Sequence, residues 1–107
     1  MKFRSTRDVI LRTSDLAKAR AFYTEVLGFA TTMSSEKLVG FETGAIQLFV
    51  ETGDAPHAPV FELLVDDVAA AKERLIAAGC AVIEEDPSVP RCYVRDPFGY
   101  VFNVGPS

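Results

Sequence analysis

The chain has 107 residues and a formal net charge of −4, and its 49% apolar and 24% charged residues are typical of a globular domain. This length predicts a single compact domain over residues 1–107. The small acidic excess argues against nucleic acid and against an anionic membrane surface as partners, since both need a basic face.

Two further features bear on where the protein works. No apolar run is long enough to cross a bilayer, and the first residues lack the apolar core of a secretory signal. The two cysteines, Cys80 and Cys92, are too few for a disulfide framework and are interpreted as reduced, buried thiols. We therefore expect a cytoplasmic protein.

The first predicted elements are a strand and a helix. Residues 7–13 alternate in polarity, as a strand with two different faces does. Residues 14–29 follow with the pattern of an amphipathic helix: Ser14 or Asp15 can cap its start, and Gly28 can end it.

The same helix pattern recurs in the second half of the chain. Residues 66–81 begin with Asp66 or Asp67 as the cap and stop at Gly79. Asp15 and Asp67 are 52 positions apart, about half the chain length. The sequence therefore predicts two copies of one structural unit.

The remaining segments complete each copy as β-α-β-β-β. A Pro- and Gly-containing linker at 52–59 separates module one, residues 1–51, from module two, residues 60–107. Further strands are predicted by β-forming residues between turn signals at 29–33, 38–42, 45–51, 59–65, 81–85, 91–95 and 100–104.

The two faces of the predicted strands differ in polarity. One face is almost wholly apolar and should lie under the helices; it carries Val9, Leu11, Ile46, Leu48, Phe61, Leu63, Val65, Phe102 and Val104. The opposite face is mixed and carries Asp8, Ile10, Arg12, Gln47, Phe49, Val60, Glu62, Leu64, Val101 and Asn103. A mixed concave face suggests a ligand cavity, and a solvated sheet face is the alternative.

Three sequence motifs resemble those of the vicinal oxygen chelate superfamily. They are the S/V-D-L/V start of each helix, the end of the first helix at FYTEVLGF, and the final DPFGYVFNV. This superfamily includes glyoxalase I, the extradiol dioxygenases, and the fosfomycin and bleomycin resistance proteins. The resemblance implies an α+β fold in which two tandem βαβββ modules form a curved mixed sheet around a cavity, and it implies a homodimer.

Metal-dependent members of this superfamily place ligands on the first and last strand of each module. Carried over to this sequence, these positions are Asp8, Gln47, Val60 and Asn103. Valine cannot bind a metal, and two ligands without histidine do not make a tight transition-metal site. The only histidine, His57, falls in the linker, where Pro59 and the change of strand face argue against ligation. The resemblance therefore implies a member with no metal and no other cofactor.

Bleomycin resistance proteins are metal-free members that hold a drug in a cleft. By that comparison, the cavity walls would be Phe49, Val60, Leu64 and Val101, and charge would come from Asp8, Arg12 and Glu62, with Glu51 a weaker candidate. Arg91 and Tyr93 share a face of the strand that often borders the cavity in relatives. Alternatively, Asp8, Arg12 and Glu62 neutralise one another in a structural network.

Three functions remain open from the sequence. The first is metal-free binding of a small molecule, for example to sequester an antibiotic, with no catalytic residue assigned. The second is a metal-dependent enzyme, a glyoxalase-type lyase or isomerase or a dioxygenase, with a nonstandard site. The third is a structural or regulatory module whose dimer interface is its function.

Overall fold

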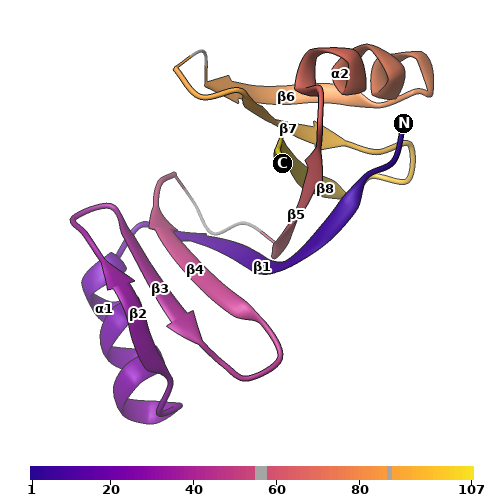
Figure 1. Cartoon of the computed structure of the whole chain (residues 1–107). Helices are drawn as coiled ribbons and strands as arrows, with labels where there is room; N and C mark the ends of the chain where they lie inside the picture. The colour runs from indigo at the N-terminus through magenta and orange to yellow at the C-terminus, as the bar shows by residue number, and fades with distance from the viewer. Residues whose placement is uncertain (55–57, 87) are drawn as a thin grey trace. The chain divides into compact units, whose positions relative to one another are not determined.

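The structure is a computed structural model and describes residues 1–54, 58–86 and 88–107. The chain forms two compact units, which are described separately (Figure 1). The first unit is Arg7–Val60, and the second unit combines Met1–Thr6 with Phe61–Ser107. His57, the linker histidine considered above, lies outside the described residues.

The first unit is one four-stranded sheet with one helix. Its strands lie in the order β2-β3-β4-β1, in which β1 and β4 are parallel and the other pairs are antiparallel. In Figure 1, the helix lies against one side of this sheet. The elements are β1 (Arg4–Thr13), α1 (Leu16–Ala21) with a π-helical segment (Phe22–Val26), β2 (Ala30–Ser34), β3 (Leu38–Glu42) and β4 (Gln47–Thr52).

The second unit repeats this arrangement. Its strands lie in the order β5-β8-β7-β6, with β5 and β8 parallel. The elements are β5 (Val60–Val65), α2 (Val68–Ala77), β6 (Ala81–Asp86), β7 (Arg91–Arg95) and β8 (Val101–Pro106). The prediction of an α+β fold built from two βαβββ modules is confirmed.

Both helices begin and end as the sequence predicts. The carboxylates of Asp15 and Asp67 each accept a hydrogen bond of 3.0 Å, from the backbone N–H of Lys18 and of Ala70. These bonds satisfy donors that the first helical turn leaves unpaired. Gly28 and Gly79 follow the helices with φ of +74° and +98°, a conformation that only glycine adopts without strain.

The first helix departs from the prediction in its second half. After Ala21 the backbone widens into the π-helical segment, where the N–H of Leu27 donates to the carbonyl of Phe22, 3.2 Å away. The hydroxyl of Thr24 donates to the carbonyl of Arg20 at 2.8 Å. A side-chain hydroxyl that donates to a backbone carbonyl in this way competes with the regular backbone hydrogen bonds of an α-helix.

Each helix packs on the apolar face of its own sheet. The core of the first unit consists of Leu16, Val39, Phe41, Leu48 and Val50. The core of the second unit consists of Val65, Ala71, Cys92, Val94 and Val104. The core residues lie on the helix side of each sheet. We call the other side of each sheet, which points away from its helix, the far face.

One predicted helix-covered residue is not covered. Phe61 is 61% exposed, although it shares a strand face with buried Val65. The physical reason is that α2 packs mainly against β6 and β8, which leaves Phe61 at the beginning of β5 uncovered. The prediction for Phe61 was wrong, because strand alternation does not report how far a helix reaches.

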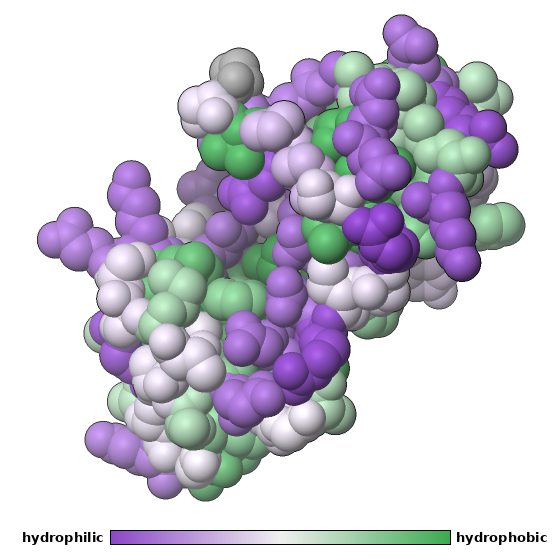
Figure 2. Space-filling model, in the orientation of Figure 1, coloured by the Kyte–Doolittle hydropathy of each residue, from purple (hydrophilic) through white to green (hydrophobic). Residues whose placement is uncertain are grey.

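The surface carries polar and apolar side chains side by side. On the side shown in Figure 2, hydrophilic and hydrophobic residues are interspersed over both units. Among the described residues, no helix has the length and apolar character that crossing a membrane requires.

The Asp67 cap provides a test of this architecture. Replacing Asp67 with Ala should lower the free energy of unfolding by about 1 kcal/mol, because the Ala70 N–H loses its acceptor. Chemical denaturation followed by circular dichroism measures the change. Glu73→Ala, at an exposed position in the middle of α2, is the matched control and should leave stability nearly unchanged. Equal effects of the two substitutions would contradict the capping role.

Candidate functional site

The far face of the first unit is organised by the parallel pairing of β1 with β4. The register places Asp8 opposite Gln47, and Arg12 opposite Glu51. Side chains directly opposite one another on neighbouring strands lie on the same face. Ile10 and Phe49 form the pair between them, so an apolar pair separates two polar ones.

Arg12 and Glu51 form a shielded ion pair. Nε and Nη2 of Arg12 donate to Oε1 of Glu51 over 3.1 and 3.0 Å. Only 17% and 23% of their side-chain surfaces are exposed. A Cβ atom at Gly53 would come within 2.7 Å of the Arg12 Cγ, so the lack of a side chain at Gly53 makes room for this arginine. Glu51, the weaker candidate from the sequence, is therefore the partner of Arg12.

A second charged contact closes the outer end of this face. Glu42 lies opposite Gln47 and extends the row that begins at Asp8. Nη2 of Arg7 donates to both carboxylate oxygens of Glu42, at 2.8 and 3.1 Å, and to the carbonyl of Gly44. Both side chains of this pair are well exposed. The contact therefore fastens the β3–β4 turn to β1 at the surface.

The far face of the second unit carries a longer polar row. Asn103 on β8 lies opposite Glu62 on β5 and opposite Tyr93 on β7, and Tyr93 in turn lies opposite Glu84 on β6. We call these four residues the Asn103 row. Leu64 and Glu62 both lie near Gly105, where an added Cβ would be 3.5 Å from Oε1 of Glu62, an ordinary contact distance.

Asn103 is the unusual member of this row. Its residue surface is only 1% exposed, and it is the one buried polar residue among those described. Neither its Nδ2 nor its Oδ1 has a hydrogen-bond partner. A buried amide without partners costs roughly 1–3 kcal/mol, so such a group needs a reason to be retained.

The other residues singled out from the sequence lie at several places. Val60 is buried at the start of β5, two residues before the one that pairs with Asn103. Val101 lies opposite Arg95, and Leu64 lies opposite Gly105. Arg91 is exposed and lies opposite Asp86 on β6.

Sequence reasoning did not single out Glu42 and Glu84, which end the two polar rows. The pairing of β6 with β7 shifts by one residue between Val82 and Glu84. Such a bulge breaks simple alternation, so counting along the strand does not place Glu84 beside Tyr93. The only signal for Glu42 is its position before the Thr43-Gly44 turn.

The residues at the ligand positions do not fit a transition metal. Each paired position carries one carboxylate and one neutral amide: Asp8 with Gln47, and Glu62 with Asn103. The described part of the chain holds no group of three or more His, Cys, Asp or Glu side chains suited to a metal ion. Transition-metal sites are built from imidazole, thiolate and several carboxylates.

The helix side of the second unit holds charged groups around a buried thiol. Burial raises the pKa of Cys92, and the nearby Glu85 carboxylate adds to this effect. The hydrogen bond and charge of Glu85 raise the pKa of Lys72, with which it forms an ion pair. Hydrogen bonds from the Ser88 hydroxyl and N–H lower the pKa of Asp86. Lys72, Glu85 and Cys92 help to line a pocket of about 540 Å³.

Cysteine labelling tests the burial of Cys92. Cys92 is 3% exposed with a raised pKa, so little reactive thiolate is available, whereas Cys80 is half-buried. Iodoacetamide at mildly alkaline pH should alkylate Cys80 first and Cys92 only after denaturation, as read by peptide mass spectrometry. Faster labelling of Cys92 than of Cys80 in the folded protein would contradict the burial of Cys92.

A raised pKa keeps the Cys92 thiol protonated in the folded protein. The free energy of unfolding should therefore fall as the pH rises through the alkaline range.

The two ion pairs of the first unit form a matched comparison. A double-mutant cycle with Arg12→Met and Glu51→Gln should give a coupling free energy of about 1–2 kcal/mol, because the pair is shielded from water. The exposed pair of Arg7 and Glu42, treated in the same way, should give less than about 1 kcal/mol. Urea denaturation measures both, and a larger coupling for the exposed pair would refute the ranking.

Known proteins share this architecture. The family model described as the Glyoxalase/Bleomycin resistance protein/Dioxygenase superfamily matches residues 7–104. No curated protein matches the sequence significantly.

The similar solved structures include extradiol dioxygenases. An extradiol ring-cleaving dioxygenase from Brevibacterium fuscum has a TM-score of 0.67 and 23% identity, over 95% of this chain and 32% of its own. Homoprotocatechuate 2,3-dioxygenase from Arthrobacter globiformis has a TM-score of 0.65 and 23% identity, over 92% of this chain and 34% of its own. This chain spans about a third of the length of these enzymes, and the likeness shows the fold. The match of the family model to most of the chain confirms the resemblance seen in its motifs: the protein belongs to the glyoxalase/bleomycin resistance protein/dioxygenase superfamily.

Proposed function

We propose that this protein binds a small organic molecule without a resident metal ion and holds the molecule rather than transforming it. Sequestration of a toxic compound such as an antibiotic is the role that this kind of binding would serve. The proposed site is the far face of the second unit, with the Asn103 row at its centre. A homodimer is part of the proposal.

The observation that carries the proposal is the unpartnered amide of Asn103. A side-chain amide offers one acceptor and two donors, and in this protein all of them lie out of reach of water without a protein partner. A ligand that presents an acceptor and a donor side by side would satisfy both ends of the amide once the side chains that cover it move aside. The free energy of burying the amide would then be offset when the ligand binds.

The chemistry of the surrounding residues supports binding over metal catalysis. The paired strand positions provide carboxylates and neutral amides, which suit hydrogen-bonded recognition of an organic molecule. Apolar Leu64 and Val101 lie on the strands of the Asn103 row and would supply contact area there, and Phe49 lies beside Ile10 on the far face of the first unit.

The substitution Asn103→Leu separates a binding role from a structural role. Leucine has nearly the same size as asparagine but no polar atom in its side chain. The free energy of unfolding of the variant should therefore be about 1–3 kcal/mol larger than that of the wild type. It should also lose any small molecule that co-purifies with the wild-type protein. Thermal unfolding and native mass spectrometry measure the two effects.

The matched control is Gln47→Leu, at the corresponding last strand of the first unit. Gln47 is only half-buried, so this substitution should leave stability nearly unchanged. If Asn103→Leu instead destabilised the protein, the amide would have structural partners and the binding role would be wrong.

Metal analysis tests the other half of the proposal. Protein purified without added metal should contain transition metals far below one equivalent, and treatment with a chelator should not change ligand retention. A stoichiometric metal would overturn the metal-free proposal and favour the glyoxalase-type or dioxygenase alternative. The native mass spectra recorded for the Asn103→Leu comparison also show whether the wild-type protein is a dimer.

A further inference from the structure

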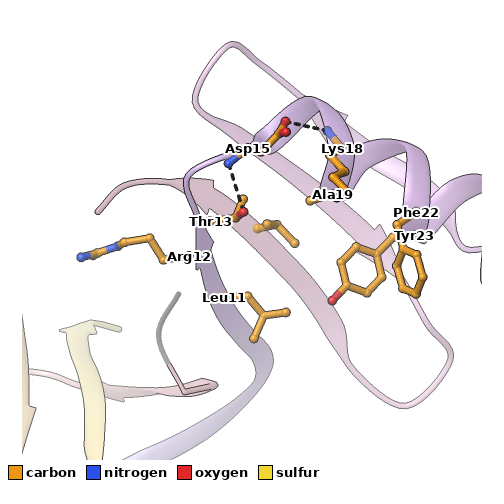
Figure 3. A pocket seen from close by; sticks show the side chains of 9 residues that line it. Leu11, Arg12, Thr13, Asp15, Lys18, Ala19, Phe22 and Tyr23 are labelled. Carbon is orange, nitrogen blue, oxygen red and sulfur yellow. Dashed lines mark hydrogen bonds between the residues drawn. The ribbon is translucent and has the colours of Figure 1, made fainter. Parts of the chain in front are cut away.

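The first unit contains a pocket on its helix side. The pocket has a volume of about 360 Å³ and lies between the α1 helix with its π-helical segment and strands β1 and β4. Its apolar wall consists of Leu11, Ala19, Phe22, Tyr23 and Val50. In Figure 3, the hydroxyl end of Tyr23 points toward Leu11, and Phe22 stands beside it.

At one position of the internal repeat, the first helix is packed less tightly than its copy. Ala19 on α1 and Ala71 on α2 hold the same repeat position, 52 residues apart. Ala71 is completely buried, whereas Ala19 is only half-buried and lines the pocket. The copies also differ downstream, because α2 stays α-helical where the first helix becomes π-helical at Phe22. Single turns of π-helix occur frequently at functional sites.

The second unit shows what kind of group completes such a core. Phe3 is half-buried and packs from the N-terminal segment against the core cluster that contains Ala71 and Val65. The second unit thus takes an aromatic ring from outside its own helix and strands. In the described part of the first unit, the partly buried residues packed on the core come from β1, the helix region and the β3–β4 turn. The second unit thus gives one example of an aromatic ring that packs on such a core, and a single ring is the kind of occupant considered for the first unit's pocket.

The pocket walls are suited to such a ring. The rings of Phe22 and Tyr23 meet edge-to-face, with their centroids 5.3 Å apart and their planes at 85°. The ring centroids of Tyr23 and Phe41 are 5.5 Å apart. Phe22 is 46% exposed, so this ring array reaches from the core to the surface. Aromatic pairs gain attraction beyond the area that they bury, which favours another aromatic ring over an aliphatic one.

The charges at the pocket argue for a neutral occupant. Lys18 and Asp15 line the pocket with opposite charges, and the guanidinium of Arg12 is paired with Glu51. Thr13 and Tyr23 contribute hydroxyl groups that can exchange hydrogen bonds with a polar substituent.

We propose that this pocket is a second binding site, which takes a neutral molecule with a single aromatic ring, such as a phenol. The site belongs to the helix side of module one and does not depend on the function proposed for the far face.

A titration with phenol, followed by the methyl NMR signals of the whole protein, tests the site. Saturable shifts are expected for the methyl groups of Leu11, Ala19 and Val50. Cyclohexanol, which has the same size but no aromatic ring, should bind about 2- to 10-fold more weakly. Equal binding of the two compounds, or shifts spread evenly over the protein, would overturn the proposal.

Two substitutions on the same helix provide the matched comparison. Ala19→Leu fills the pocket and should weaken phenol binding at least 10-fold, whereas Ala17→Leu, exposed and outside the pocket, should leave binding unchanged. Phe22→Ala removes a half-exposed wall and should weaken binding several-fold even if Ala19→Leu fails to fold.

Two further outcomes separate this site from its alternatives. Asn103→Leu should bind phenol as the wild type does, so failure of the far-face proposal would leave this one intact. If the Leu11 and Val50 signals instead shifted with protein concentration and not with phenol, the pocket would hold a side chain from a second copy, and the proposal would be wrong.

Discussion

The parallel pairing of the first and last strand within each module is the constraint on which the rest of the structure depends. Parallel neighbours cannot be joined by a tight turn, so the chain must cross over the sheet between them. Here the crossover consists of the helix and two further strands. It brings Asp8 opposite Gln47 and Glu62 opposite Asn103, pairs that are separated by about forty residues in the chain. The polar rows exist because this pairing fixes which residues meet.

Much of the fold could be predicted from local signals. The aspartate caps and the left-handed glycines define both helices, because these residues act within one helical turn. The repeat between the two helices then predicts the modules. The π-helical segment could not be foreseen, since its hydrogen bonds depend on a competition between the Thr24 hydroxyl and the backbone.

The candidate site was only partly predictable. Alternation identified the far face and included Asn103 and Glu62 among its candidates, and the family resemblance added Tyr93, but neither could show that Asn103 lacks partners. That property depends on the lengths and angles of neighbouring side chains. The register also changes the comparison with metal-dependent relatives: the residue beside Asn103 is Glu62, whereas the motif-based comparison selected Val60. A shared scaffold leaves such choices open, because function depends on the side chains that meet and not on the fold.

The division of β1 between the two units has a consequence for the order of folding. Residues 8–13 pair with β4 in the first unit. Met1–Thr6 belong to the second unit, where the Thr6 hydroxyl donates to the carbonyl of Glu62, 56 residues away. During synthesis from the N-terminus, the first unit can close once β4 has been made. The opening segment of the chain, including the Phe3 ring, has no packing partner until β5 to β8 follow. Residues 1–6 are made before the first unit but dock after it has closed, and their docking would report that β5 to β8 have folded.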